Sequence, residues 1–164
     1  MQLDAASRAG AGIWKGRGWA RGHWLAALVA VASSILMTWP LSLSAGHQLL
    51  RAAYFWDGYT NAMIMGSRVD ALLGRSALSP YDDYFFAPLP NSIVFNENLF
   101  GLSLLFAPFY LLSDNPLWAY NLTLLVSLAL SVFFTYLLVL RLTRSAHAGV
   151  IAGVAFAFCP YVLF

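Results

Sequence analysis

The sequence predicts an all-α fold: a polytopic membrane helix bundle with about three transmembrane helices and a pair of interfacial juxtamembrane helices in the first external loop. Hydrophobic residues make up 60% of the 164 residues and charged residues only 10%, against roughly 45–50% and 25% in soluble domains. A soluble protein with so few charges could not cover its surface with polar groups. The net charge of +2 excludes nucleic acid as a partner, and the single cysteine excludes a disulfide framework.

The chain starts with a basic segment followed by an apolar one. Residues 1–22 hold four basic residues and one acid, so we expect a cytoplasmic tail by the positive-inside rule. Residues 23–43 carry no charge and are long enough for about 30 Å of helix, which predicts the first transmembrane helix. A cleaved signal peptide is the alternative, but the apolar run is long for one.

The basic residues decide which of the later apolar stretches cross the membrane. The turn at residues 141–145 contains two arginines and no acid, so it should be cytoplasmic like the tail. An even number of spans must therefore separate the tail from the turn. The stretch 99–112 is too short for a span and contains Pro108, which we expect to break its helix. The second and third transmembrane helices are then 117–140 and 146–164.

The remaining segment, residues 44–116, becomes a long external loop that holds six of the seven acids. Helical spacing predicts a first juxtamembrane helix near 58–74, amphipathic and lying on the membrane surface. Its apolar side consists of Tyr59, Ala62, Met63, Gly66, Val69 and Leu73, and its polar side of Thr60, Ser67, Arg68 and Arg75. A second juxtamembrane helix is expected near 98–112. It should stop at Ser113-Asp114-Asn115-Pro116, which also starts the next helix.

Asp57 is the strongest catalytic candidate. It lies between Trp56 and Gly58, at the expected boundary of membrane and water, where a partly dry carboxylate could act as a general base. The alternative is a structural role, as the N-cap or a first-turn acid of the helix near 58–74.

Other charged residues of the loop admit two interpretations each. Asp82 and Asp83 are weak candidates for a divalent cation, because adjacent carboxylates can bind one with further ligands; an ordinary solvated loop is the alternative. Glu97 could be a second active-site acid or a helix cap. Arg51, Arg68 and Arg75 could bind a lipid phosphate or an acceptor, or pair with loop acids. No spacing typical of a zinc or nucleotide site is present, and no organic cofactor is expected.

The order of these segments resembles a known superfamily. It comprises a basic tail, a first span, Trp56-Asp57-Gly58 and an interfacial helix that ends near Asp114-Asn-Pro-Leu-Trp-Ala-Tyr-Asn121. A span then leads into Arg141-Leu-Thr-Arg144 and a helix of small residues that ends in Pro160-Tyr161. Residues 22–164 are similar to the N-terminal part of the polytopic GT-C glycosyltransferases, which include protein O-mannosyltransferases and aminoarabinose transferases. The usual Asp-Glu pair after the first span is Asp57-Gly58 here, so only the Asp carries over.

The resemblance implies transfer of a sugar from a polyprenyl-phosphate donor on the outer side of the membrane. Asp57 would take the proton from the acceptor hydroxyl or orient it, and the hydroxyl would attack the anomeric carbon with inversion. A basic residue would meet the leaving lipid phosphate, and Arg51, Arg68 and Arg75 are the basic residues of the loop, although none matches a family motif. Some members of the family use a metal ion and others do not.

Such enzymes have more spans than this chain, so we expect an N-terminal fragment, a truncated reading frame or a degenerate copy that is inactive on its own. The expected location is a bacterial inner membrane, with loop 44–116 periplasmic or extracellular. Membrane lipid and the lipid-linked sugar are the expected partners. Two other functions remain open: a non-catalytic membrane scaffold or assembly subunit, and a piece of a transporter or flippase.

Overall fold

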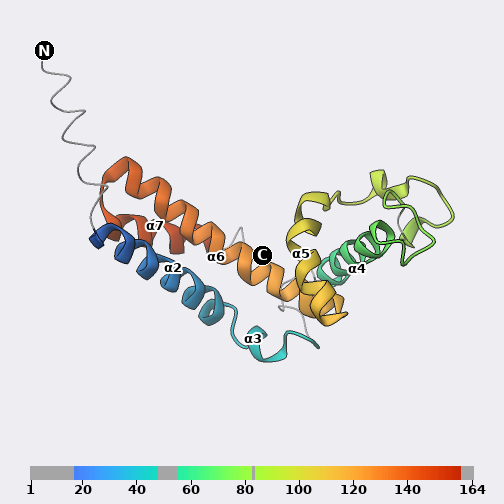
Figure 1. The fold of residues 1–164 in the computed structure, drawn as a ribbon, viewed down its shortest axis with the longest axis horizontal. Coiled ribbons are helices and arrows are strands. Elements are labelled where there is room, and N and C mark those ends of the chain that lie inside the picture. Colours follow the sequence, from blue (N-terminus) through green and yellow to red (C-terminus); the bar gives the residue numbers. More distant parts are fainter. Residues whose placement is uncertain (1–16, 48–54, 83, 160–164) are drawn as a thin grey trace, which may run out of the picture. The chain divides into compact units, whose positions relative to one another are not determined.

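The computed structural model describes residues 17–47, 55–82 and 84–159, and these residues contain helices and no strand (Figure 1). The all-α prediction is therefore confirmed for the described part of the chain. The α-helices are α2 (Arg17–Met37), α3 (Leu41–Ser44), α4 (Phe55–Leu72), α5 (Phe100–Ser113), α6 (Pro116–Thr143) and α7 (Ala146–Ala157). Two short 3-10 helices, η1 (Tyr84–Phe86) and η2 (Ser92–Phe95), lie in the segment between α4 and α5.

The chain folds into two compact units. The first consists of α2 up to Ser33, the part of α6 from Leu128 onward, and α7. The second contains α3, α4, α5 and the part of α6 up to Ser127, together with η1 and η2.

The first unit is held together by small side chains between its three helices. Ala30 of α2, Val132 of α6 and Ala157 of α7 form its buried core. Gly149 and Gly153 of α7 are buried, and a Cβ atom on Gly153 would lie 2.5 Å from the carbonyl oxygen of Val132. The Gly-x-x-x-Gly spacing therefore allows the backbones of α6 and α7 to approach closely, as it does in membrane helix pairs.

Among the described residues, α6 is the one helix long and apolar enough to cross a membrane. It has 28 residues, and 22% of its most apolar window is buried, whereas a core helix of a soluble domain would be mostly buried. Three other apolar helices are shorter: Gly22–Met37, Phe100–Ser113 and Ala146–Ala157. These helices establish one segment that is long enough to span a membrane, and not the predicted bundle of three. The predicted end of the third span, 160–164, lies outside the described residues.

The first apolar segment is not one continuous helix. We expected a span over 23–43, but α2 ends at Met37 and α3 begins at Leu41. Pro40 explains the interruption, because proline has no N–H to donate and disfavours the helical conformation of the residue before it.

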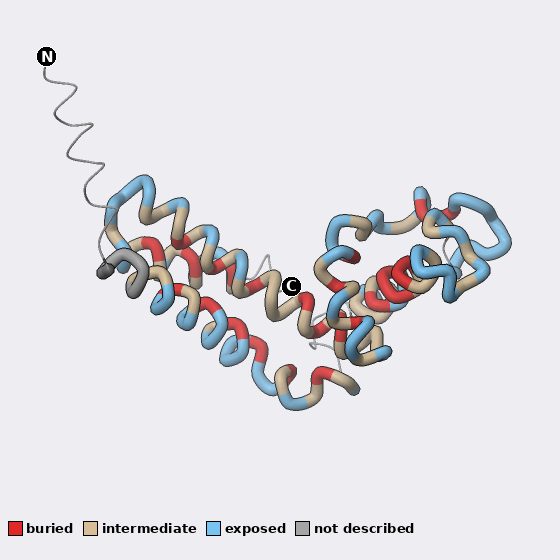
Figure 2. The backbone as a smooth tube through the Cα atoms, viewed as in Figure 1, coloured by how far each residue is buried: buried red, intermediate tan, exposed pale blue. Residues whose placement is uncertain are grey.

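The second unit is centred on the packing of α4 against α5. Its core consists of Met65 and Val69 from α4, Phe106 and Tyr110 from α5, and Ala119 from α6. Figure 2 shows the buried positions gathered along α4. Two predicted helices, near 58–74 and 98–112, are therefore present as a packed pair.

The predicted stop-and-start signal between α5 and α6 is confirmed. Asp114 adopts the left-handed conformation (φ 53°) directly after α5, and its N–H donates to the carbonyl of Tyr110. The Oδ1 atom of Asn115 accepts hydrogen bonds from the N–H groups of Leu117 and Trp118, at 3.0 and 3.1 Å. Pro116 occupies the first position of α6, where a missing N–H costs nothing.

Two local expectations were wrong. Helix α5 continues through Pro108, which lies on the exposed side of the helix, where water or lipid surrounds the affected carbonyl instead of packed side chains. The polar face assigned to the helix near 58–74 is also incorrect: Arg68 is buried and Met63 is exposed. The cause is Phe100 of α5, whose ring centroid lies 4.4 Å from the Arg68 guanidinium carbon in a cation–π contact.

The close approach of α6 and α7 leads to a first prediction. Gly153→Ala places a methyl group against the backbone of Val132, and overpacking of this kind costs about 1–3 kcal/mol. The matched control is Gly101→Ala in α5, where a Cβ atom meets nothing within 4 Å and better helix propensity should slightly stabilise the protein. Thermal unfolding of the detergent-solubilised protein should show a lower midpoint for Gly153→Ala only. Equal midpoints for the two variants would contradict the close packing.

Candidate functional site

Asp57 is exposed and belongs to the first turn of α4. The helix starts three residues before the predicted boundary, at Phe55, so of the two structural roles considered, the first-turn acid is the one observed. A negative charge there is favourable because the N-terminal end of a helix carries a partial positive charge. An exposed carboxylate is also free to meet a substrate.

The structure brings Asp57 and Glu97 to the same neighbourhood. Both carboxylates interact electrostatically with Tyr120 near the start of α6, and the side chain of Asn61 forms a hydrogen bond with the Tyr120 hydroxyl. Glu97 is exposed and lies three residues before α5. Asp57, Asn61 and Glu97 therefore all lie in the vicinity of Tyr120.

The three arginines do not gather at Asp57. Arg68 is 3% exposed and covers Phe100, so its guanidinium has little surface to offer a phosphate. Arg75 is exposed and follows the other end of α4, 18 residues from Asp57. Asp57 is 15 residues from Leu72 at the end of the helix, which is about 22 Å at roughly 1.5 Å per residue. Arg51 lies outside the described residues.

Asp82 has a clear structural role. Its two carboxylate oxygens accept hydrogen bonds from the N–H groups of Ser79, at 3.0 Å, and Asn91, at 2.7 Å. These bonds tie together the two ends of the loop that contains η1. Asp83 lies outside the described residues. In the described ranges, no three His, Cys, Asp or Glu side chains are grouped so as to hold a metal ion.

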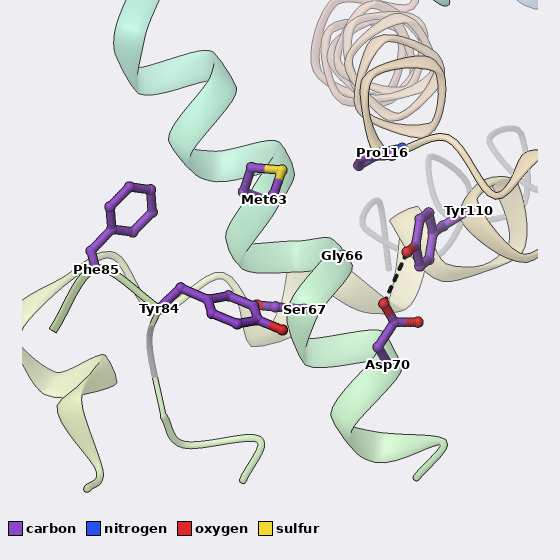
Figure 3. Close-up of a pocket in the computed structure, with 8 residues that line it drawn as sticks. All are labelled: Met63, Gly66, Ser67, Asp70, Tyr84, Phe85, Tyr110 and Pro116. Carbon is purple, nitrogen blue, oxygen red and sulfur yellow. Dashed lines mark hydrogen bonds between the residues drawn. The ribbon is translucent and has the colours of Figure 1, made fainter. Parts of the chain in front are cut away.

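A cavity in the second unit lies beside α4, toward its C-terminal end (Figure 3). It has a volume of about 400 Å³. Apolar and aromatic side chains form most of its wall, with Ser67 and Asp70 as polar groups on α4. The full lining is Met63, Gly66, Ser67, Asp70, Tyr84, Phe85, Tyr110 and Pro116. A mostly apolar wall with a few polar groups is typical of small-molecule sites.

A hydrogen bond between α4 and α5 forms the polar side of this cavity. The Tyr110 hydroxyl donates to Oδ2 of Asp70 at 3.0 Å, and Figure 3 shows the other carboxylate oxygen directed away from the phenol. Burial raises the pKa of Tyr110 to about 12, and the hydrogen bond to Asp70 and the negative charges of Asp70 and Asp114 act in the same direction, against a smaller lowering by Arg75. Tyr110 therefore remains a hydrogen-bond donor at any physiological pH.

A second cavity adjoins the first through the same two residues. It has a volume of about 500 Å³ and is lined by Asp70, Arg75, Tyr110, Leu111 and Asp114. Three charged side chains therefore surround an open, polar space at the C-terminal end of α4. The apolar cavity and the polar cavity share Asp70 and Tyr110.

Sequence reasoning did not single out Asp70 or Tyr110. Met63, Gly66 and Asp70 recur at intervals of three and four residues, so helical spacing alone could have placed them on one face. Tyr110 is 40 positions from Asp70, and nothing in local spacing reveals a partner at that distance.

Comparisons of the chain with models of protein families, with curated proteins and with solved structures found no match. The resemblance to GT-C glycosyltransferases therefore rests on the segment order and motifs of the sequence.

The Tyr110–Asp70 pair leads to a second prediction. The absorbance of wild-type protein, minus that of Tyr110→Phe, should show one phenol that ionises near pH 12. In Asp70→Asn the amide oxygen still accepts the hydrogen bond but the charge is lost, so this titration should move to lower pH.

The same shift sets the sign of the pH dependence of stability. The folded-state pKa of Tyr110 is raised from its usual 10.0 to about 12. The contribution of the protonated Tyr110 to the free energy of unfolding is therefore complete below pH 10 and is lost as the pH rises to 12. Tyr110→Phe should therefore lose less stability than wild type over this window in thermal unfolding. A wild-type titration of Tyr110 near pH 10 would contradict the buried hydrogen bond.

Proposed function

We propose that residues 22–164 form the part of an integral membrane glycosyltransferase that carries its catalytic acid. The donor is a sugar on a polyprenyl phosphate, and the acceptor lies on the outer face of the membrane. The observation that carries this proposal is the position of Asp57: an exposed carboxylate in the first turn of a helix that packs on α5 and is followed along the chain by the long apolar helix α6. The segment order that resembles GT-C enzymes agrees with it.

In this proposal, helices α4 and α5 lie at the membrane surface as a platform. Helix α6 crosses the membrane, since it is apolar, 28 residues long and little buried by the rest of the chain. The two shorter apolar helices Gly22–Met37 and Ala146–Ala157 are the other two spans, so that the basic turn after α6 returns to the cytoplasm.

Asp57 acts as the general base. It takes the proton of the acceptor hydroxyl while the hydroxyl oxygen forms a bond to the anomeric carbon of the sugar. The bond from that carbon to the phosphate oxygen breaks, and the electron pair leaves with the lipid phosphate, which gives inversion. Glu97 lies close enough to share the electrostatic environment of Asp57 through Tyr120 and orients the acceptor. Arg51 is the basic residue nearest to Asp57 in the sequence and stabilises the leaving phosphate.

A third prediction concerns membrane topology. In a Cys159→Ala background, single cysteines replace Ala77, Ser113 and Ser145, and intact cells are treated with an impermeant thiol reagent. Cysteines at 77 and 113 should react from outside, and the one at 145 should be protected until the cells are opened. Protection at 113 combined with reaction at 77 would make α5 a true span and remove the platform.

A fourth prediction tests the chemistry. A photoreactive polyprenyl phosphate should label the protein in membranes, and polyprenyl phosphate should compete while the uncharged polyprenol should not. Asp57→Asn should retain labelling; in membranes that also contain the remaining spans of the enzyme, it should lower sugar transfer by at least about a hundredfold, the usual effect of losing a general base. Asp4→Asn is the control with the same change of charge in the tail. Labelling that polyprenol abolishes equally well would favour a scaffold without a phosphate site.

A further inference from the structure

The apolar and polar cavities adjoin each other and differ in the chemistry of their walls. The apolar part has Met63, Phe85 and Pro116 in its wall, and the polar part has Arg75 and Asp114. Asp70 and Tyr110 line both parts. A ligand that fills this space should therefore be an amphiphile, with a polar group at one end and hydrocarbon at the other.

The charges around the polar cavity are of both signs. Arg75 supplies a guanidinium group, and Asp70 and Asp114 supply carboxylates. No ion pair joins this guanidinium to either carboxylate within the part of the chain that the structure describes. Opposite charges that line one cavity without forming an ion pair are complementary to a zwitterionic ligand.

The hydrogen bond from Tyr110 holds the Asp70 carboxylate in place at the junction. Because the pKa of the phenol is raised to about 12, the Tyr110 hydroxyl stays neutral at physiological pH. It therefore does not itself attract the cationic group of a ligand. The second oxygen of Asp70 points away from Tyr110 (Figure 3) and is available to accept a hydrogen bond from a ligand.

We propose that this double cavity binds the headgroup of a phospholipid with a primary ammonium group, of the ethanolamine type. The phosphate lies on Arg75, whose planar guanidinium suits a phosphate. The ammonium group lies between Asp70 and Asp114 and donates hydrogen bonds to the carboxylates. The glycerol and the first methylenes of the acyl chains enter the apolar cavity beside Met63 and Phe85.

Two features favour this ligand over related ones. A choline headgroup has no N–H to donate, so it cannot satisfy both carboxylates, and a phosphatidylglycerol headgroup has no cation to place beside them. A soluble zwitterion would leave the apolar cavity of about 400 Å³ empty. Burial of hydrocarbon in this cavity adds to the affinity for the lipid.

This inference rests on the proposed position of α4 and α5 at a membrane surface, but not on sugar transfer. Asp70 is 13 residues after Asp57, which is about 20 Å along α4 at roughly 1.5 Å per residue. The lipid site is thus separate from the proposed catalytic acid. Bound lipid would seat the C-terminal end of α4 at the headgroup level of the bilayer.

The test is a titration of the detergent-solubilised full chain with short-chain phosphatidylethanolamine by calorimetry. We expect saturable binding, and at least tenfold weaker binding of the phosphatidylcholine and phosphatidylglycerol with the same chains. Asp70→Asn and Arg75→Gln should each lower the binding affinity for the ethanolamine lipid by about tenfold, since a charge-assisted hydrogen bond contributes about 1.5 kcal/mol or more. Arg141→Gln, an equal change of charge on an exposed residue of α6, should bind as wild type.

Several outcomes would overturn the proposal. Equal affinity for the three headgroups, or unchanged affinity in both Asp70→Asn and Arg75→Gln, would place the lipid elsewhere. Glycerophosphoethanolamine that binds as tightly as the lipid would identify a soluble zwitterion as the ligand. Circular dichroism checks that Asp70→Asn is folded, and the exposed Arg75 gives an independent variant that breaks no packing. The two proposals fail separately, because labelling by polyprenyl phosphate reports only the donor site.

Discussion

The packing of Tyr110 against α4 is the interaction on which the second unit depends. Its ring stacks on Phe106, with centroids 5.4 Å apart, and lies in the core with Met65 and Val69. Its hydroxyl reaches Asp70. A tyrosine suits this position because an apolar ring can be buried while its polar end finds a partner at the edge of the core. Tyr110 thus packs the C-terminal half of α4 against α5 and lines both cavities.

The order of the helices that surround this core follows from a few local signals. Asp114 in the left-handed conformation ends α5, and the Asn115 side chain caps α6. The same turn is tied to the chain after α3, because the amide of Asn115 donates to the carbonyl of Gly46 at 3.2 Å. Asn121, six residues further along the chain in α6, donates to the carbonyl of Ala45. Two asparagines therefore fix the end of the α3 segment beside the start of α6.

Much of this architecture could be predicted from sequence because it depends on residues that are close together in the chain. The apolar run of α6, the turn at Asp114 and Asn115, and the two glycines of α7 each depend on residues within a few positions of one another. The errors concern features that other segments decide. Arg68 carries a charge but is buried with its guanidinium over the ring of Phe100, and the partner of Asp70 comes from a residue 40 positions away. Tertiary contacts of this kind override helical spacing, which reports only that residues share a face.

The two acids of α4 to which the proposals assign roles differ in their surroundings. Asp57 is exposed in the first turn, where the helix N-terminus favours its negative charge. Asp70 lies near the other end, where the helix dipole disfavours a negative charge, and it is stabilised there by the Tyr110 hydroxyl. A carboxylate kept in an unfavourable position by a specific hydrogen bond, beside an open cavity and an arginine, suits the binding of a cationic group. In the two proposals, one helix presents an acid for proton transfer at its beginning and an acid for recognition near its end, separated by several turns so that neither ligand obstructs the other.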